Sequence, residues 1–157
     1  MKITAWRITK KKYINNAFSG EGAKIFGGRW NPVGYPMVYV AQNLSLAILE
    51  LIVHLEDDSD ITRFVAIPVT FDKSQVHVLP QSQLPENWFD LPISEQSQMV
   101  GKKWLEQKQS LLLQVPSSVV PSESNFLINP LHPQFGQLEI GSPQSLCIDQ
   151  RISKLLH

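Results

Sequence analysis

The stretch AKIFGGRWNPVGYPMVYVAQNLSLAILELIVHL, residues 23–55, contains the features that decide the fold. A glycine-rich loop carries Arg29, and two apolar runs follow it. The first run, residues 36–41, is short and predicts a strand. Asn43 is a suitable N-cap for a helix over residues 45–55. The stretch therefore predicts a loop, a strand and a helix in direct succession.

The rest of the chain predicts further short strands and one more helix. Strand-like runs occupy residues 1–9, 63–71, 75–79, 111–120, 125–129, 138–140 and 147–152. Residues 94–109 have the apolar spacing of a helix, whereas residues 10–34 read mostly as a long loop. Pro68 within its run indicates an edge strand or a bulge. These elements predict a single α+β domain over residues 1–157, with a mixed, mostly antiparallel sheet.

The composition is that of a globular chain. Its 157 residues are 43% hydrophobic and 18% charged, and the formal net charge is +0. A neutral chain lacks the many cationic contacts of backbone binding, so we expect no direct nucleic-acid partner. The N-terminus has no apolar stretch of signal-peptide length, and the longest apolar run, residues 44–55, is too short to span a bilayer. We therefore expect a cytoplasmic location without membrane contact. Cys147 has no disulfide partner and is expected to be buried.

Glu50 is the anomalous residue of the predicted helix, because an ionised side chain is costly to bury among apolar neighbours. Helical spacing groups Leu46, Leu49 and Val53 on one face and puts His54 one turn after Glu50. Two interpretations stay open: a plain Glu–His surface pair, or a carboxylate held for chemistry. The four histidines have no metal-ligand spacing, so no metal is expected.

The glycine-rich loop and the strand after it supply two further candidates. Gly28 permits close approach of a ligand, and Arg29 beside it is suited to a bidentate grip on phosphate or to a structural salt bridge. The loop is neither a P-loop nor a dinucleotide fingerprint. Strand alternation sets Tyr39 on the face opposite Val38 and Val40, as a ligand-stacking ring or as a core aromatic.

Polar residues also occur late in the chain, in VPSSVVP and NFLINPLHP. Ser117 and Ser118 lack the elbow of a serine hydrolase, so a hydrogen bond to a ligand or to the backbone is the expected role. Asn129 is a candidate ligand-binding residue. His132 has no visible carboxylate partner and favours a structural role.

Four of these motifs together resemble a known family. GGRWN, VYVAQNLSLAILE, VPSSVV and NFLINPLHP follow one another in the order found in RES-domain proteins, the toxins of bacterial type II toxin–antitoxin pairs of the RES–Xre type. The resemblance extends from Trp6 to Ile152. It implies a fold similar to the catalytic domain of ADP-ribosyltransferase toxins and an activity on NAD+.

The resemblance also implies residue roles. The family's functional arginine, tyrosine, glutamate and serine correspond here to Arg29, Tyr39, Glu50 and Ser117, with Ser118 as the neighbouring possibility. Arg29 would hold the diphosphate and help to keep Glu50 ionised. Tyr39 would pack against the nicotinamide end, and Ser117 would hydrogen-bond the ligand.

The implied activity is cleavage of the nicotinamide–ribose bond by hydrolysis or phosphorolysis, which depletes NAD+ and arrests growth. Transfer of ADP-ribose to a protein is the alternative, and a non-catalytic partner-binding module is the second alternative. NAD+ would be a substrate, with no metal and no other cofactor. The expected partner is an Xre-like helix-turn-helix antitoxin, and analogy adds a toxin homodimer within that complex.

Overall fold

The computed structural model describes residues 1–55 and 60–154, and its strands form one mixed sheet. The order is β4-β5-β6-β2-β1-β3-β7, with β8 also paired to β3. Only β4 and β5 run parallel among these pairs, which confirms the predicted α+β class. The strands are β1 (Lys2–Lys10), β2 (Val38–Ala41), β3 (Phe64–Asp72), β4 (Val76–Val78), β5 (Leu112–Pro116), β6 (Ser124–Ile128), β7 (Glu139–Ile140) and β8 (Gln144–Ser145).

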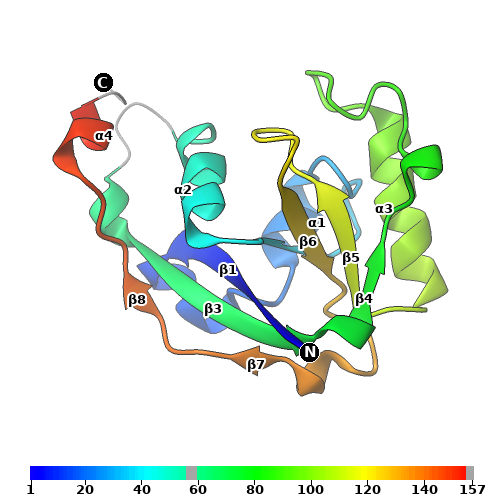
Figure 1. Cartoon of the computed structure of the whole chain (residues 1–157), viewed down its shortest axis with the longest axis horizontal. Helices are drawn as coiled ribbons and strands as arrows, with labels where there is room; N and C mark the ends of the chain where they lie inside the picture. The colour runs from blue at the N-terminus through cyan, green and yellow to red at the C-terminus, as the bar shows by residue number, and fades with distance from the viewer. Residues whose placement is uncertain (56–59, 155–157) are drawn as a thin grey trace.

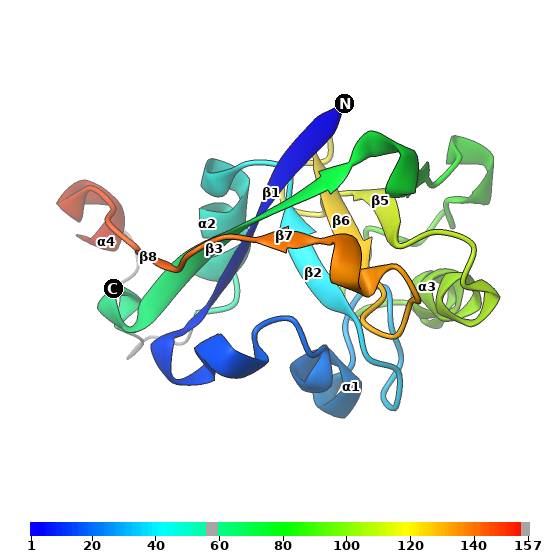
Figure 2. The same ribbon diagram turned by 90° about the horizontal axis from the view of Figure 1, so that it is seen from below.

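Helices cover parts of this sheet (Figure 1). Helix α2 lies over β1, and α3 stands beside β4 and β5. Figure 2 shows β7 and β8 following β3 along the sheet's edge. The α-helices are α1 (Glu21–Phe26), α2 (Leu44–Ile52), α3 (Glu95–Gln107) and α4 (Gln150–Lys154), and the 3-10 turns are η1 (Lys11–Asn16), η2 (Ile61–Arg63), η3 (Lys73–Gln75), η4 (Gln81–Gln83) and η5 (Phe135–Gln137). In the described part of the chain, no helix is long and apolar enough to cross a membrane.

Helix α2 begins where the sequence predicts and ends earlier. The Asn43 side chain accepts a hydrogen bond from the main-chain N–H of Leu46 at 2.7 Å, so the N-cap is confirmed. The helix ends at Ile52 rather than at residue 55. Its buried side chains are Leu46 and Ala47, while Leu49 and Val53 are exposed, so the predicted apolar face was wrong. The buried side of α2 that packs on β1 and β2 therefore contains fewer residues than the apolar sequence of the helix suggests.

The two faces of β2 enter separate parts of the core, as alternation predicts. Val38 and Val40 belong to a cluster with Phe71 and Phe126, whereas Tyr39 packs on the other side against a cluster centred on Trp104 of α3. Both faces of the central strands are therefore covered.

Other expectations need correction. Pro68 is inside β3, which pairs with β1 along its whole length, and lies between the residues paired to β8 and those paired to β7. That gap accommodates the missing N–H, so neither a free edge nor a bulge is required. The interval 10–34 contains η1 and α1, residues 147–152 form no strand but run into α4, and Cys147 is exposed.

Helix α3 contacts the arginine-bearing loop at a position without a side chain. A Cβ added to Gly101 would lie 1.6 Å from the main-chain oxygen of Trp30. The helix and the loop therefore touch backbone to backbone, which explains a glycine inside a helix.

We predict that Gly101→Ala separates α3 from this loop and lowers the free energy of unfolding by about 3 kcal/mol, the upper range for overpacking. Urea denaturation followed by circular dichroism measures the change. Gly22→Ala is the matched control, because a Cβ there meets no atom within 4 Å. Equal unfolding midpoints for the two variants would contradict the prediction.

Candidate active site

Glu50 is half-buried on α2, and its carboxylate points to the turn between β5 and β6. Its Oε1 atom accepts hydrogen bonds from Ser117 Oγ at 2.7 Å and from Asn125 Nδ2 at 2.8 Å. Its Oε2 atom accepts no hydrogen bond within residues 1–55 and 60–154. One oxygen is thus fixed by neutral donors, and the other is available to a ligand.

Ser117 is fully buried, and its hydroxyl makes three hydrogen bonds. It donates to Glu50 and accepts from the main-chain N–H groups of Val119 at 3.0 Å and Val120 at 3.1 Å. Accepting two N–H groups orients the hydroxyl proton toward the carboxylate. The structure brings Ser117 to Glu50, whereas the Ser118 side chain makes no hydrogen bond among the described residues.

Asn125 is a site residue that sequence reasoning missed. It begins the pairing of β6 with β2, opposite Ala41, and is paired with Val115 of β5 on its other side. Asn125 is the first residue of the motif NFLINPLHP, but nothing in the sequence pairs it with Glu50, and only the folded structure brings the two together.

The predicted Glu–His pair takes a different form. The His54 Nδ1 atom lies 2.8 Å from the main-chain oxygen of Glu50 and makes no hydrogen bond to its carboxylate. The imidazole therefore bonds the helix backbone one turn earlier, and the side chain of Glu50 remains directed at Ser117.

Tyr39 forms a second cluster with the glycine-rich loop. Its hydroxyl donates to Asn31 Oδ1 at 2.6 Å and accepts from the main-chain N–H of Trp30 at 3.1 Å. Burial raises the pKa of this hydroxyl, outweighing the hydrogen bond from Trp30 and the charge of Arg29, which lower it. Tyr39 therefore remains a protonated donor at neutral pH.

Arg29 extends from this loop to the segment before α3. Its Nη1 atom donates to the main-chain oxygens of Trp88 at 2.7 Å and Asp90 at 3.1 Å. Within the described residues no carboxylate lies within 4.0 Å of the guanidinium, so it pairs neither with Glu50 nor with another acid. Carbonyl dipoles orient Arg29 without neutralising its charge, which suits a residue that receives an anion.

The two clusters lie on one face of the sheet. Tyr39 is paired with Leu127, and Asn125 precedes Leu127 by two residues on β6. Diagonal neighbours on the same face of an antiparallel pair are about 7–8 Å apart. Register therefore makes the Glu50 cluster and the Tyr39 cluster adjacent.

Asn129 is not brought to this cluster. It is buried at the opposite end of β6 from Asn125, where its Oδ1 accepts from the N–H of Leu131 and its Nδ2 donates to the carbonyl of Leu105. His132 likewise bonds the main-chain oxygen of Lys108. Both side chains tie the turn after β6 to the end of α3, and Asn129 as a ligand-binding residue stays a prediction without contacts to support it.

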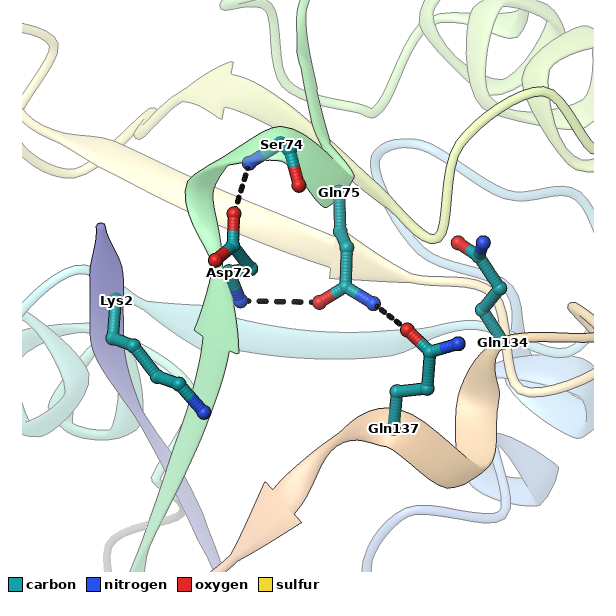
Figure 3. A pocket seen from close by; sticks show the side chains of 6 residues that line it. All are labelled: Lys2, Asp72, Ser74, Gln75, Gln134 and Gln137. Carbon is teal, nitrogen blue, oxygen red and sulfur yellow. Dashed lines mark hydrogen bonds between the residues drawn. The ribbon is translucent and has the colours of Figure 1, made fainter.

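A separate polar hollow of about 500 Å³ lies near the end of β3 (Figure 3). Its side chains largely bond one another: Asp72 accepts from Ser74, and Gln75 bridges the N–H of Asp72 and Gln137. None of the predicted site residues lines it. Among the described residues, no group of three His, Cys, Asp or Glu side chains could hold a metal ion.

The fold and the site define a class: an α+β sheet that carries a glutamate on a helix and an arginine on a glycine-rich loop over the same face. Residues 4–149 match the RES domain, and the chain belongs to the RES domain family. The resemblance noted from the four motifs is thereby confirmed.

The chain is similar to two named relatives and to one solved structure. It is 40% identical over 131 residues to Toxin Res of Photorhabdus laumondii, covering 83% of each chain. It is 38% identical over 138 residues to the Prs ADP-ribosylating toxin of Sphingobium sp., covering 85% of this chain and 86% of that one. A chain in the crystal structure of the M. tuberculosis MbcT–MbcA toxin–antitoxin complex aligns with a TM-score of 0.76 at 20% identity, over 99% of this chain and 89% of that chain.

MbcT also matches part of this sequence directly. The M. tuberculosis protein is named NAD(+) phosphorylase MbcT, and 50 residues are 40% identical, covering 29% of this chain and 27% of that protein.

We predict that Ser117→Ala lowers the free energy of unfolding by about 1–3 kcal/mol, because it leaves the N–H groups of Val119 and Val120 without their acceptor and removes one of the two donors to Glu50 Oε1. Ser118→Ala is the matched control and is expected to change little. Thermal unfolding of both variants measures the difference. A larger loss in Ser118→Ala than in Ser117→Ala would contradict this assignment of the pair.

Proposed function

We propose that this chain is the toxin of a toxin–antitoxin pair and that it consumes NAD+ by cleaving the nicotinamide–ribose bond. The observation that carries the proposal is the Glu50 carboxylate, which Ser117 and Asn125 orient through one oxygen. The names of the relatives, two of them toxins and one an NAD(+) phosphorylase, support it.

The chemistry asks for a carboxylate of this kind. When the bond between the ribose C1′ and nicotinamide breaks, both electrons go to the ring nitrogen, and nicotinamide departs neutral. Positive charge then develops on the ribose, as in glycoside cleavage. Glu50, with one oxygen not hydrogen-bonded by the described residues, would stabilise that charge. A preoriented carboxylate does so without reorganising in the transition state.

Arg29 and Tyr39 complete the proposed site. The guanidinium, held by two carbonyls and not paired with a carboxylate among the described residues, would bind the diphosphate. The Tyr39 ring, adjacent to Asn125 on the same face, would bound the nicotinamide end. No metal enters this reaction.

An oxygen of phosphate or water would then bond to the ribose carbon that nicotinamide has left. The product is ADP-ribose phosphorylated at that carbon, or ADP-ribose with release of a proton from the water. Transfer of ADP-ribose to a protein side chain is the second candidate. The similarity to the Prs ADP-ribosylating toxin, which covers most of both chains, favours this candidate.

Purified chain incubated with adenylate-labelled NAD+ distinguishes these outcomes. Label in ADP-ribose supports hydrolysis, a phosphate-dependent second product supports phosphorolysis, and label on a protein band in added lysate supports transfer. Intact NAD+ in every condition, with a variant lacking Glu50 still arresting growth, would favour a partner-binding module.

The proposed partner is an antitoxin with an Xre-like helix-turn-helix domain, which would carry the DNA binding that we do not expect from this neutral chain. The MbcT–MbcA complex supports an antitoxin partner. Leu49 on α2 and Val53, just after the end of that helix, are exposed on either side of Glu50 in the sequence and are apolar surface that such a partner would cover. A toxin homodimer within the complex, acting in the cytoplasm, completes the proposal.

We predict that Glu50→Gln lowers kcat for NAD+ consumption by about 10²–10³ and changes KM little, because the carboxylate acts on charge that develops only in the transition state. Nicotinamide release measured by chromatography gives both constants. Glu106→Gln, the same change on an exposed glutamate of α3, is the control and should retain wild-type kinetics. A variant Glu50→Gln with near wild-type kcat would remove the main support for the proposal.

A further inference from the structure

The hydroxyl of Tyr39 is fully engaged inside the protein. Its proton is donated to Asn31 at 2.6 Å, and its oxygen accepts the Trp30 N–H at 3.1 Å. A phenol has one proton to donate, so Tyr39 has none left for a ligand. Both of its partners follow Arg29 directly in the sequence.

Asn31 extends the connection to both ends of the loop. It is completely buried, and its Nδ2 atom donates to the main-chain oxygens of Ala23 at 2.8 Å and Tyr35 at 3.0 Å. One amide thereby joins α1, the segment before β2, and the Tyr39 side chain. A short buried network with every donor matched is rigid.

Gly28 allows this arrangement. A Cβ at Gly28 would lie 2.7 Å from the Tyr39 hydroxyl oxygen and 2.9 Å from Asn31 Oδ1. The sequence suggests that this glycine admits a ligand, whereas the structure uses its small size to admit the tyrosine hydroxyl. Gln98 of α3 then holds the Gly28 carbonyl at 3.1 Å.

The same loop also contacts the residue that holds the Arg29 guanidinium, because Trp30 packs against Trp88. The Trp30 ring stacks on Trp88, with centroids 6.3 Å apart and planes inclined by 20°. Trp88 supplies the nearer carbonyl to Arg29. Displacement of Trp30 would therefore disturb both the backbone of Arg29 and the group that orients its guanidinium.

We propose that Asn31 and Tyr39 form a buried clasp whose function is to position Arg29 for an anionic ligand. Tyr39 is then a positioning residue whose hydroxyl acts through the arginine loop, defined as residues 27–31, rather than on the ligand. This inference rests on the proposed function for the identity of the anion, the diphosphate of NAD+.

The test measures NAD+ binding by calorimetry in the Glu50→Gln background, which is expected to bind the ligand and to consume it about 10²–10³ times more slowly. Tyr39→Phe should weaken NAD+ binding about tenfold, because the loop that positions Arg29 loses the hydrogen bonds of the Tyr39 hydroxyl, and one hydrogen bond corresponds to about a tenfold change in affinity. Gly28→Ala should weaken binding similarly, because its Cβ displaces the same hydroxyl. In an Arg29→Ala background, Tyr39→Phe should have no further effect.

Tyr35→Phe is the matched control. Tyr35 packs against the same core cluster, but its hydroxyl makes no hydrogen bond among the described residues. The control should bind NAD+ as the parent does. A loss from Tyr39→Phe that persists undiminished without Arg29 would overturn the clasp, because the hydroxyl would then act on the ligand directly.

Hydrogen exchange of the Trp30 amide separates this inference from the proposed function. The amide should exchange slowly in the parent and in Tyr35→Phe, and at least tenfold faster in Tyr39→Phe. This readout needs no ligand. If NAD+ neither binds nor reacts, the proposed function fails, but the exchange rate of the Trp30 amide still tests whether the clasp exists. An unchanged exchange rate in Tyr39→Phe would overturn the clasp.

Discussion

The hydrogen bond from Ser117 to Glu50 is the interaction on which the site depends. It joins α2 to the turn between β5 and β6 through two residues that are 67 positions apart in the sequence. The carboxylate is stabilised by neutral donors and, within the described residues, by no cation. Neutral donors offset the cost of desolvation and leave the net charge in place. The turn, the helix and the strand register thus converge on one side-chain oxygen.

Arg29, like Glu50, is a charged group held by neutral partners. Main-chain carbonyls orient its guanidinium, and among the described residues no acid neutralises it. Had Arg29 and Glu50 paired, each would have cancelled the field of the other, and a salt bridge between them would have to break before a ligand entered. Separate neutral supports avoid that cost. They leave one anion and one cation on a single face of the sheet.

The sequence predicted most of the framework because its signals are local. Asn43 caps a helix wherever an apolar run follows it, and β2 alternates because its two faces meet different clusters. The extent of the buried stripe on α2 was not predictable, since it depends on the shape of β1 and β2 beneath it. Cys147 was misjudged because its apolar neighbours Leu146 and Ile148 pack against the core and leave the cysteine exposed between them.

The site residues also fall into those with a local sequence signal and those that only the fold reveals. Glu50, Arg29 and Tyr39 were found through a local anomaly, a glycine-rich loop and a family resemblance. Asn125 and Asn31 were missed because their roles come from register and from packing across the loop. An asparagine is suited to both places, since its amide supplies a donor and an acceptor without a charge. A charged residue at either position would compete with the carboxylate or the guanidinium beside it. Uncharged supports around charged groups are therefore the common design of the two clusters.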